Sequence, residues 1–307
     1  VLEQIVQGGY MIEIKNLKKS FDTNVVLSDL CSNIPDNAIY GLIGANGSGK
    51  STLLRLINSI YKPDEGTILI DGVSSYDNEE VKKEMVFVPD DLYFYPGYSL
   101  YDTAKFYQAM YPKFNLEFVF DTARKLKLDF NKSINTFSKG MRRQCAIICA
   151  LATNAKYIFF DETFDGIDPV VRQYFKKLIA KQMTKQDTTI IMTSHNLREL
   201  EDICDNLGLI SEHKILFESD VNSLKTDMIK VQISFKNDFD ESLFAKLDVL
   251  SFKKIGKVAT LIIKDKKGSK KYLESLKPVI LDYLPLTLEE IFIYQMEALG
   301  YEFNKFI

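Results

Sequence analysis

The chain has 307 residues, with 39 lysines and arginines against 42 aspartates and glutamates, and a net charge of -3. This length suits one to three domains, and two are predicted. The near balance of charge, with no long block of one sign, does not indicate a nucleic-acid partner or an anionic membrane surface. No stretch approaches the roughly eighteen uninterrupted apolar residues that a membrane-spanning helix needs.

The four cysteines are scattered along the chain, and no secretory signal opens it, which favours a reducing cytosol. Cys145 and Cys149 are four residues apart and would share a helix face. No second ligand pair follows at the spacing of a zinc site. Both cysteines are therefore predicted to be buried packing residues.

Residues 1–10 end just after a glycine pair and are interpreted as an N-terminal extension. From residue 11, short apolar runs rich in β-forming residues alternate with helical patterns. This alternation predicts an α/β domain with a largely parallel sheet over residues 11–220. Its predicted strands are 11–21, 38–43, 156–160 and 188–194, and its predicted helices are 50–60, 169–183 and 196–205.

Two further parts of the chain differ in pattern from this core. Residues 90–154 are helical in pattern and rich in tyrosine and phenylalanine, which predicts a helical subdomain inserted in the α/β domain. Beyond Asp220 the composition shifts toward lysine, aspartate and short strands, which predicts a small accessory α+β domain over residues 221–307. Its last helix is predicted to begin at Thr287, because Glu290 three residues later completes a capping box.

The stretch GANGSGKS, residues 44–51, matches the phosphate-binding pattern G-x-x-x-x-G-K-[ST]. It follows an apolar strand pattern and opens a helical one, which is the context that the motif requires. Glycines let successive N–H groups point at a phosphate, and the helix N-terminus adds a positive dipole end. Lys50 is predicted to reach the β- and γ-phosphates, and Ser51 to give an oxygen to Mg²⁺. The predicted nucleotide-binding residues are Gly44, Asn46, Gly47, Ser48, Gly49, Lys50, Ser51 and Thr52.

Acidic and histidine residues follow two other predicted strands. Asp161 and Glu162 come directly after an apolar run, at the strand end where open α/β sheets bind ligands. Asp161 is predicted to hold Mg²⁺, directly or through water, and Glu162 to orient or deprotonate an attacking water. His195 leaves the next strand at the same sheet edge and is predicted to sense the γ-phosphate. The alternatives are a solvated acidic turn and an ordinary surface or core histidine.

With these motifs in this order, residues 11 to about 218 resemble the ATP-binding subunits of ABC transporters. GANGSGKST resembles the family's Walker A sequence, FFDE its Walker B sequence with the catalytic glutamate, FDGIDP its D-loop and TSHN its H-loop. The resemblance implies an ABC-type P-loop core that binds ATP and Mg²⁺ and hydrolyses ATP. It also implies that Phe21 stacks on adenine, although an aromatic residue near a strand end is more often part of a core.

The stretch FSKGM, residues 137–141, resembles the family's LSGGQ signature, with Phe137, Lys139 and Met141 as departures. In the family, the signature serine and glycine bind the γ-phosphate of the ATP held by the opposite subunit, which implies this role for Ser138 and Gly140. Without the resemblance, the stretch is a serine-capped helix start.

A larger departure lies at Asp90, where the family expects a glutamine that contacts Mg²⁺. The aspartate could still accept a metal contact, or it could be a solvated loop acid, and the sequence leaves both alternatives open. The aromatic residues after Asp90 would, by the resemblance, belong to the subdomain that receives a helix of the membrane partner. Internal packing of that subdomain explains the same residues equally well.

The resemblance implies an ATPase that closes as a head-to-tail homodimer or heterodimer and powers a separately encoded transmembrane permease. Such a subunit lies in the cytoplasm, on the cytoplasmic face of the membrane. SKGM and the C-terminal LTLEEIFIYQMEALG resemble bacterial exporters of the multidrug, bacitracin or lantibiotic-immunity type. The alternative is a soluble ABC ATPase that acts in regulation or on a nucleic-acid or ribosomal partner. The single phosphate loop and the lack of long coiled-coil patterns argue against it.

Overall fold

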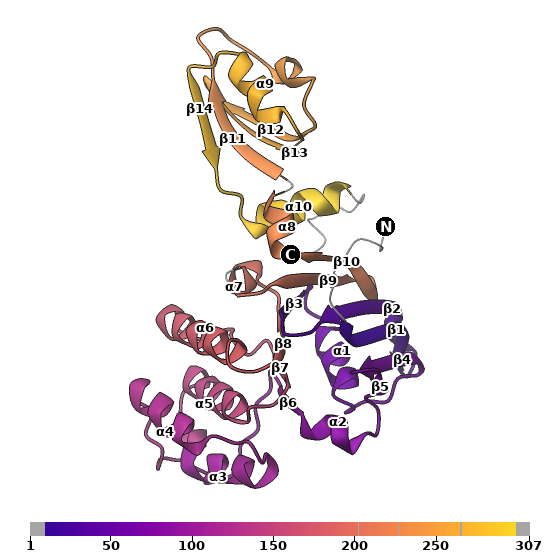
Figure 1. The fold of residues 1–307 in the computed structure, drawn as a ribbon, viewed down its shortest axis with the longest axis vertical. Helices are drawn as coiled ribbons and strands as arrows, with labels where there is room; N and C mark the ends of the chain where they lie inside the picture. The colour runs from indigo at the N-terminus through magenta and orange to yellow at the C-terminus, as the bar shows by residue number, and fades with distance from the viewer. Residues whose placement is uncertain (1–9, 202, 227, 265, 299–307) are drawn as a thin grey trace. The chain divides into compact units, whose positions relative to one another are not determined.

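The computed structural model describes residues 10–201, 203–226, 228–264 and 266–298 (Figure 1). The predicted N-terminal extension, residues 1–10, therefore lies outside the described residues except for Tyr10, which begins a strand. The chain forms two compact units, one up to Glu218 and one from Ser219. Within the described residues, every helix is too short or too polar to span a bilayer.

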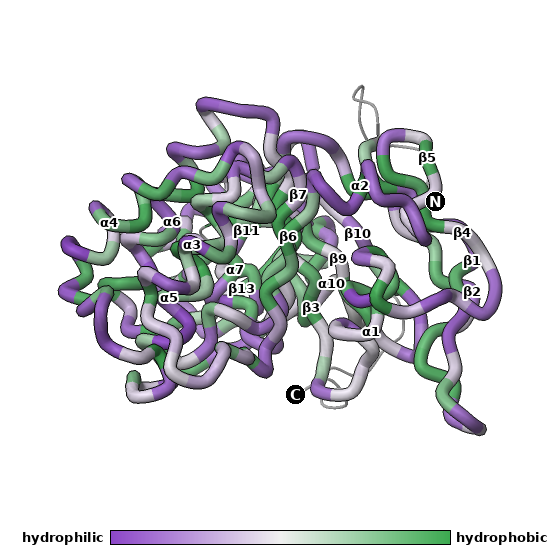
Figure 2. Tube along the Cα trace, turned by 90° about the horizontal axis from the view of Figure 1, so that it is seen from below, coloured by the Kyte–Doolittle hydropathy of each residue, from purple (hydrophilic) through white to green (hydrophobic). Residues whose placement is uncertain are grey.

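A six-stranded sheet lies at the centre of the first unit, and the strands at its middle are buried on both faces. β3 pairs in parallel with β8 and β9, and β7 pairs in parallel with β6 and β8. Strands buried on both faces require continuous apolar runs, which the hydrophobic residues along β3, β6 and β7 provide (Figure 2). The predicted α/β core with a largely parallel sheet is confirmed. In spatial order the strands are β10 (Lys214–Asp220), β9 (Asn206–Ser211), β3 (Ile39–Ile43), β8 (Thr189–Ser194), β7 (Tyr157–Asp161) and β6 (Met85–Val88).

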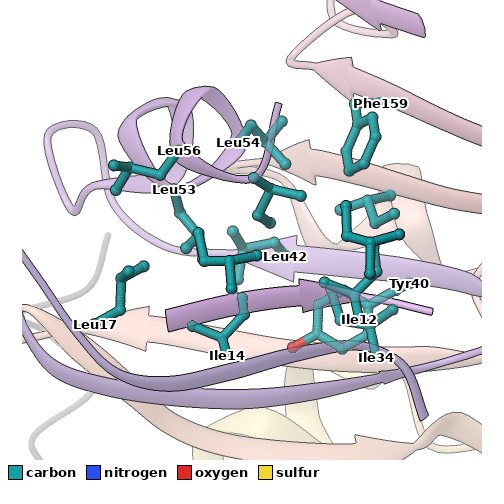
Figure 3. Close-up of a cluster of buried hydrophobic side chains, with 14 of the residues drawn as sticks. Ile12, Ile14, Leu17, Ile34, Tyr40, Leu42, Leu53, Leu54, Leu56 and Phe159 are labelled. Carbon is teal, nitrogen blue, oxygen red and sulfur yellow. The ribbon is translucent and has the colours of Figure 1, made fainter. Parts of the chain in front are cut away.

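A second sheet of four strands goes beyond the sequence prediction, which contains only its first strand. β1 pairs antiparallel with both β2 and β4, and β4 pairs with β5. Side chains of β1 and β2 pack with leucines of helix α1 in one buried cluster that also includes Leu42 of β3 (Figure 3). This cluster fixes the helix that follows the phosphate loop. The elements are β1 (Tyr10–Phe21), β2 (Asn24–Pro35), β4 (Glu65–Ile70), β5 (Val73–Ser74) and α1 (Lys50–Ile57).

The segment after β6 is helical, as predicted, and α5 is its most buried helix. Cys145 and Cys149 of α5 are buried, and burial raises the pKa of the Cys145 thiol to about 12. No cluster of histidine, cysteine or acidic residues in the described ranges could hold a metal ion by itself. The predicted packing role of both cysteines is confirmed. The helices here are α3 (Leu100–Met110), α4 (Leu116–Lys125) and α5 (Lys139–Ala152), with a 3-10 turn at Ile134–Thr136.

Helices α2 (Glu79–Lys83), α6 (Pro169–Met183) and α7 (Leu197–Leu200) complete the first unit. α6 has the predicted bounds, but α7 is shorter than the predicted helix at 196–205. The chain must re-enter the sheet directly after it. The Asp205 N–H donates to the Ile39 carbonyl at 2.8 Å, and the Ile39 N–H donates to Asp205 Oδ2 at 2.8 Å.

The second unit is built on a four-stranded antiparallel sheet, with a core that includes Val231, Phe244 and Leu273. Thr287 and Glu290 form the predicted capping box, because each backbone N–H donates to the other's side chain. The predicted α+β fold of this part is confirmed. Its elements are β12 (Val249–Ile255), β13 (Val258–Lys264), β11 (Met228–Ser234) and β14 (Ile280–Leu284), with α8 (Val221–Thr226), α9 (Ser269–Ser275) and α10 (Leu288–Ala298).

Candidate nucleotide site

The predicted phosphate loop joins β3 to α1. Gly47 and Gly49 have φ angles of +80° and +103°, which only glycine adopts without strain. A Cβ on Gly44 would lie 2.5 Å from the carbonyl oxygen of Ile210. The Ser48 Oγ is buried and has no partner among the described residues. The loop is therefore a tight glycine cradle with a free polar group, which fits a phosphate-bearing ligand.

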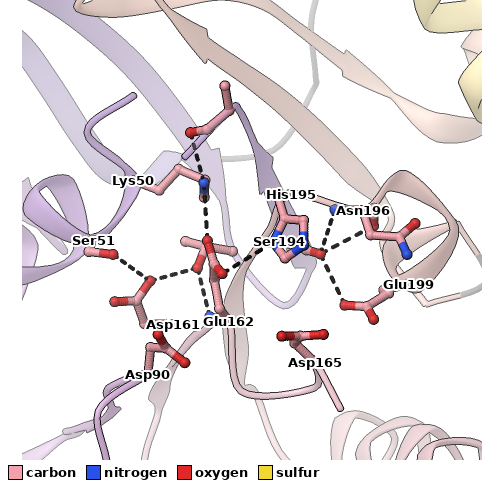
Figure 4. A network of polar contacts seen from close by, with 12 residues as sticks. Lys50, Ser51, Asp90, Asp161, Glu162, Asp165, Ser194, His195, Asn196 and Glu199 are labelled. Atoms are coloured by element: carbon pink, nitrogen blue, oxygen red, sulfur yellow. Dashed lines mark hydrogen bonds and ion pairs between the residues drawn. The ribbon is translucent and has the colours of Figure 1, made fainter. Parts of the chain in front are cut away.

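Lys50 is buried at the base of this loop, with 4% of its surface exposed. Its Nζ donates to the carbonyl oxygens of Gly44 at 2.8 Å and Ala45 at 3.1 Å. It also lies 3.2 Å from Glu162 Oε1 (Figure 4). A buried ammonium needs such partners. A phosphate that enters the loop would compete with Glu162 for this ammonium.

Asp161 ends β7 and is fully buried. Its Oδ1 accepts hydrogen bonds from Ser51 Oγ at 3.0 Å and Thr193 Oγ1 at 2.8 Å. Its Oδ2 is also buried but has no partner among the described residues. A buried carboxylate oxygen without a partner is costly. A carboxylate beside a hydroxyl is a hard oxygen donor set, so Ser51 and Asp161 fit a magnesium ion.

Glu162 follows Asp161 in a left-handed conformation, with φ of +45°, which is uncommon for a residue with a side chain. Its N–H donates to Thr193 Oγ1 at 2.9 Å, which holds this turn. Its carboxylate lies between Lys50 and His195, whose Nδ1 is 3.2 Å from Oε2 (Figure 4). The structure thus brings together three predicted residues, one from the start of α1 and two from just beyond the ends of β7 and β8.

Thr193 is a site residue absent from the sequence prediction. The parallel register pairs it directly with Asp161, so one hydroxyl reaches both the Asp161 carboxylate and the Glu162 N–H. The available signal is its position at the exit of the strand that carries His195. A hydroxyl residue there, beside the acidic residues of the neighbouring strand, is placed to position them.

The signature stretch lies at the start of α5. The Ser138 Oγ accepts a hydrogen bond from the Met141 N–H at 3.3 Å, which confirms the predicted serine cap. Ser138 and Lys139 are exposed. Among the described residues, no hydrogen bond or ion pair joins Ser138 or Gly140 to the phosphate loop of the same chain.

The other predicted ligands lie around this centre. Asn46 is exposed in the loop, and Thr52 is in the first turn of α1. Phe21 lies on the surface at the end of β1, with its ring centroid 5.3 Å from that of Tyr61. Asp90, two residues beyond β6, pairs through Oδ1 with the Arg143 guanidinium. The adenine role of Phe21 and the metal role of Asp90 stay predictions.

Known proteins share this arrangement of elements and motifs. The ABC transporter family model matches residues 27–165. The ABC transporter ATP-binding protein YtrB of Bacillus subtilis (strain 168) is 33% identical over 284 residues, which cover 92% of this chain and 97% of that protein. The chain belongs to the ABC transporter ATP-binding proteins. Its enzymatic activity is the hydrolysis of ATP, and the YtrB match extends into the unit from Ser219.

Two further comparisons agree with membership of the ABC family. The lantibiotic transport ATP-binding protein SrtF of Streptococcus pyogenes is 28% identical over 230 residues, which cover 74% of this chain and 99% of that protein. A solved ATP-binding subunit of an ABC transporter matches 70% of this chain and 92% of its own, with a TM-score of 0.63 at 23% identity. The solved structure confirms the fold of the ABC ATPase core.

Proposed function

We propose that this ABC ATPase powers a separately encoded transmembrane permease of an exporter. It works as a head-to-tail dimer of ATPase subunits with Mg²⁺ as cofactor. The observation that carries the proposal is the position of Glu162 between Lys50 and His195, at the edge of the sheet that also holds Asp161. This arrangement supports a hydrolytic site rather than a site for binding alone.

Each residue of this site has a chemical task in the proposal. Lys50 binds the phosphates. When they enter the loop, its ammonium gives up the ion pair with the Glu162 carboxylate. The released Glu162 carboxylate orients the attacking water and accepts its proton. His195 holds the water and the γ-phosphate in line with Glu162. Ser51 and Asp161 would hold Mg²⁺, which supplies positive charge to the phosphate oxygens when bound.

Ser138 and Gly140 serve the second half of a composite site. They lie at the N-terminus of a 14-residue helix, whose dipole and free N–H groups favour an anion. In the part of the chain that the structure describes, neither residue has a hydrogen bond or ion pair with the phosphate loop, which supports a ligand that belongs to another subunit. The second subunit is either a further copy of this chain or a different ATPase.

Exposed aromatic side chains after Asp90 support a membrane partner. Tyr95 packs against three aromatic neighbours at ring-centroid distances of 5.1 to 5.7 Å, yet the group is 36% to 75% exposed. Apolar surface gathered in this way marks an interaction site. We place the permease contact there, which puts the subunit on the cytoplasmic face of the membrane. The members of this patch are Tyr93, Tyr95, Tyr98 and Phe106.

The cargo and the second unit complete the proposal. The likeness to SrtF, a lantibiotic transport protein by name, supports export of an antimicrobial peptide or a similar drug. The part from Ser219 is proposed as an accessory domain of the ATPase.

Purification from membranes tests the permease assignment. The tagged chain, expressed with its neighbouring genes, should recover a protein with many membrane spans. Tyr93→Ser with Tyr95→Ser should lose that protein and keep ATP binding. Tyr76→Ser, at a tyrosine outside the patch that is 42% exposed against 47% for Tyr95, is the control and should change neither. Recovery of ribosomes or nucleic acid in place of a membrane protein would overturn the proposal in favour of the soluble alternative.

A further inference from the structure

Arg143 is a charged residue with only 1% of its surface exposed, in the second turn of α5. Its guanidinium joins two other loops. Nη2 donates to Asp90 Oδ1, beyond the end of β6. Nη1 donates to the backbone carbonyl oxygen of Asp165 and lies 3.7 Å from Asp165 Oδ2. Arg143 has no role among the predicted site residues.

The three loops that meet at Arg143 carry the signature, the D-loop and the residue that replaces the family's glutamine. Two further contacts link the same loops. A Cβ on Gly140 would lie only 3.3 Å from the Gly166 carbonyl oxygen, so the signature backbone packs closely on the D-loop. Thr163 Oγ1 donates to the Val88 carbonyl oxygen at 3.4 Å, which ties the exits of β7 and β6 together.

Because the Arg143 guanidinium is buried, its contacts with the loops of Asp90 and Asp165 depend on one another. A buried cation that loses one partner is left with an uncompensated charge, which is far more costly than the loss of an exposed ion pair. Two carboxylates balance the Arg143 charge, and Asp90 is the one in direct hydrogen bond with the guanidinium, so Arg143 favours an anion at position 90. A glutamine there would supply no negative charge, so the acidic departure at Asp90 and the buried Arg143 form a matched pair.

We propose that Arg143 is a positioning residue that holds Ser138, Gly140 and the D-loop in one unit, with Asp90 as its counter-ion instead of a magnesium ligand. The proposal rests on the proposed function, in which Ser138 and Gly140 serve the ATP of another subunit. Loss of the junction lets the start of α5 shift, so the composite site no longer closes correctly. Binding of ATP to the chain's own phosphate loop is unaffected, because Lys50 and Ser51 lie on other elements.

A double-mutant cycle with Arg143→Gln and Asp90→Asn in a Glu162→Gln background tests this proposal. Two quantities are measured at fixed Mg²⁺: the ATP dissociation constant of the monomer and the protein concentration at half-maximal ATP-driven dimerisation. Asp90→Asn should weaken dimerisation by about tenfold, because the buried Arg143 charge loses the carboxylate bonded to it. Arg143→Gln should weaken it by about as much, because it removes the donors that join α5 to the other two loops. The double change should be no worse than either single one, and ATP affinity should stay within about twofold.

Controls separate positioning from general damage to the fold. Arg124→Gln and Asp121→Asn remove an exposed ion pair on α4 and should change neither quantity. Asp90→Glu keeps the charge and should retain dimerisation. If Arg143→Gln does not fold, Asp90→Asn still decides the question, because the Asp90 side chain is 49% exposed and its loss leaves the core packed.

Three results would overturn the proposal. The first is that the effects of Arg143→Gln and Asp90→Asn on dimerisation add up in the double variant. The second is that Asp90→Asn dimerises like the parent. The third is that Asp90→Asn raises the Mg²⁺ concentration needed for ATP binding, which would make Asp90 a metal ligand. If the Glu162→Gln parent itself stays monomeric with ATP, the homodimer in the proposed function fails. In that case, the same double-mutant cycle, measured by thermal unfolding of the ligand-free chain, decides whether Arg143 and Asp90 are coupled.

Discussion

Lys50 and Asp161, beside the phosphate loop, are buried and bonded to residues from several elements, whereas Ser138, at the signature, is exposed and bonds only within its own helix. The phosphate-loop side is complete within the chain apart from its ligands. The signature side presents a helix N-terminus to solvent. The charged Arg143, one turn further along, is buried.

The difference follows from what burial demands. The buried Lys50 is paired with Glu162 of its own chain, whereas the buried Asp161 has one carboxylate oxygen without a partner among the described residues. An exposed helix N-terminus needs no partner from its own chain and can bind an anion that belongs to another molecule. The fold therefore builds one complete half-site and one open half-site, and in the proposed dimer the second becomes functional across the interface.

Among changes on the phosphate-loop side, replacement of Glu162, the proposed base, should give the largest loss of ATP hydrolysis. Glu162→Gln should lower the steady-state rate of ATP hydrolysis by about 10²- to 10⁴-fold, the usual contribution of a general base. ATP affinity should be retained or rise, because Lys50 loses an anion that competes with phosphate. Glu80→Gln, an exposed acid on α2, is the control. Turnover near the wild-type rate in Glu162→Gln would remove Glu162 from the role of base.

A change at the open half-site should give a comparable loss of turnover by a different route. Ser138→Arg should lower hydrolysis by about 10²- to 10³-fold, as loss of preorganised donors to a transition state does, with ATP binding intact. Ser275→Arg, at a serine that also bonds within its own helix, should have no effect. Weaker ATP binding by monomeric Ser138→Arg would place Ser138 in the site of its own chain and break the distinction between the two sides.

Loss of the buried ammonium should act on binding. Lys50→Ala should raise the ATP dissociation constant by about 10- to 100-fold, because hydrogen bonds to a charged group are worth about 1.5–3 kcal/mol. Lys113→Ala, which removes an exposed partner of Glu84, is the control. Titration with a fluorescent ATP analogue measures both variants. Unchanged affinity in Lys50→Ala would contradict the assignment of the phosphate loop.

The smallest expected effect is structural and concerns Thr193. Thr193→Val should lower the free energy of unfolding by about 1–3 kcal/mol, because the Glu162 N–H loses its acceptor and Asp161 loses a donor. Thr184→Val removes an exposed hydroxyl bond at the end of α6 and should cost less. Urea unfolding curves compare the two. Equal stability of Thr193→Val and the parent would mean that Thr193 does not hold this turn.

The sequence predicts the phosphate-loop side well because each element there leaves a local pattern. The apolar runs before Lys50 and Asp161 identify buried parallel strands, and parallel strands end at one sheet edge. The antiparallel partners of β1 are harder to predict. β2 alternates buried and exposed residues only in part, with shifts of register against β1, so its period of two is broken.

The residues that sequence reasoning misses are those whose partners lie far away along the chain. Arg143 finds one partner 53 residues earlier and another 22 residues later, and no periodicity relates these positions. Thr193 reaches Asp161 only through the pairing of β7 with β8. Both contacts depend on how the loops meet in three dimensions, which a local pattern does not determine.

We propose that the open half-site completes the ATP site of a second subunit. The molecular mass of Glu162→Gln in solution, measured by light scattering with and without ATP and Mg²⁺, tests this most directly. Glu162→Gln should be a monomer without ATP, a dimer with it, and an ATP-bound monomer when Ser138→Arg is added. A chain that stays monomeric at saturating ATP would exclude a second copy of this chain as the partner. A dimer that forms equally well with Ser138→Arg would contradict the role of the open half-site.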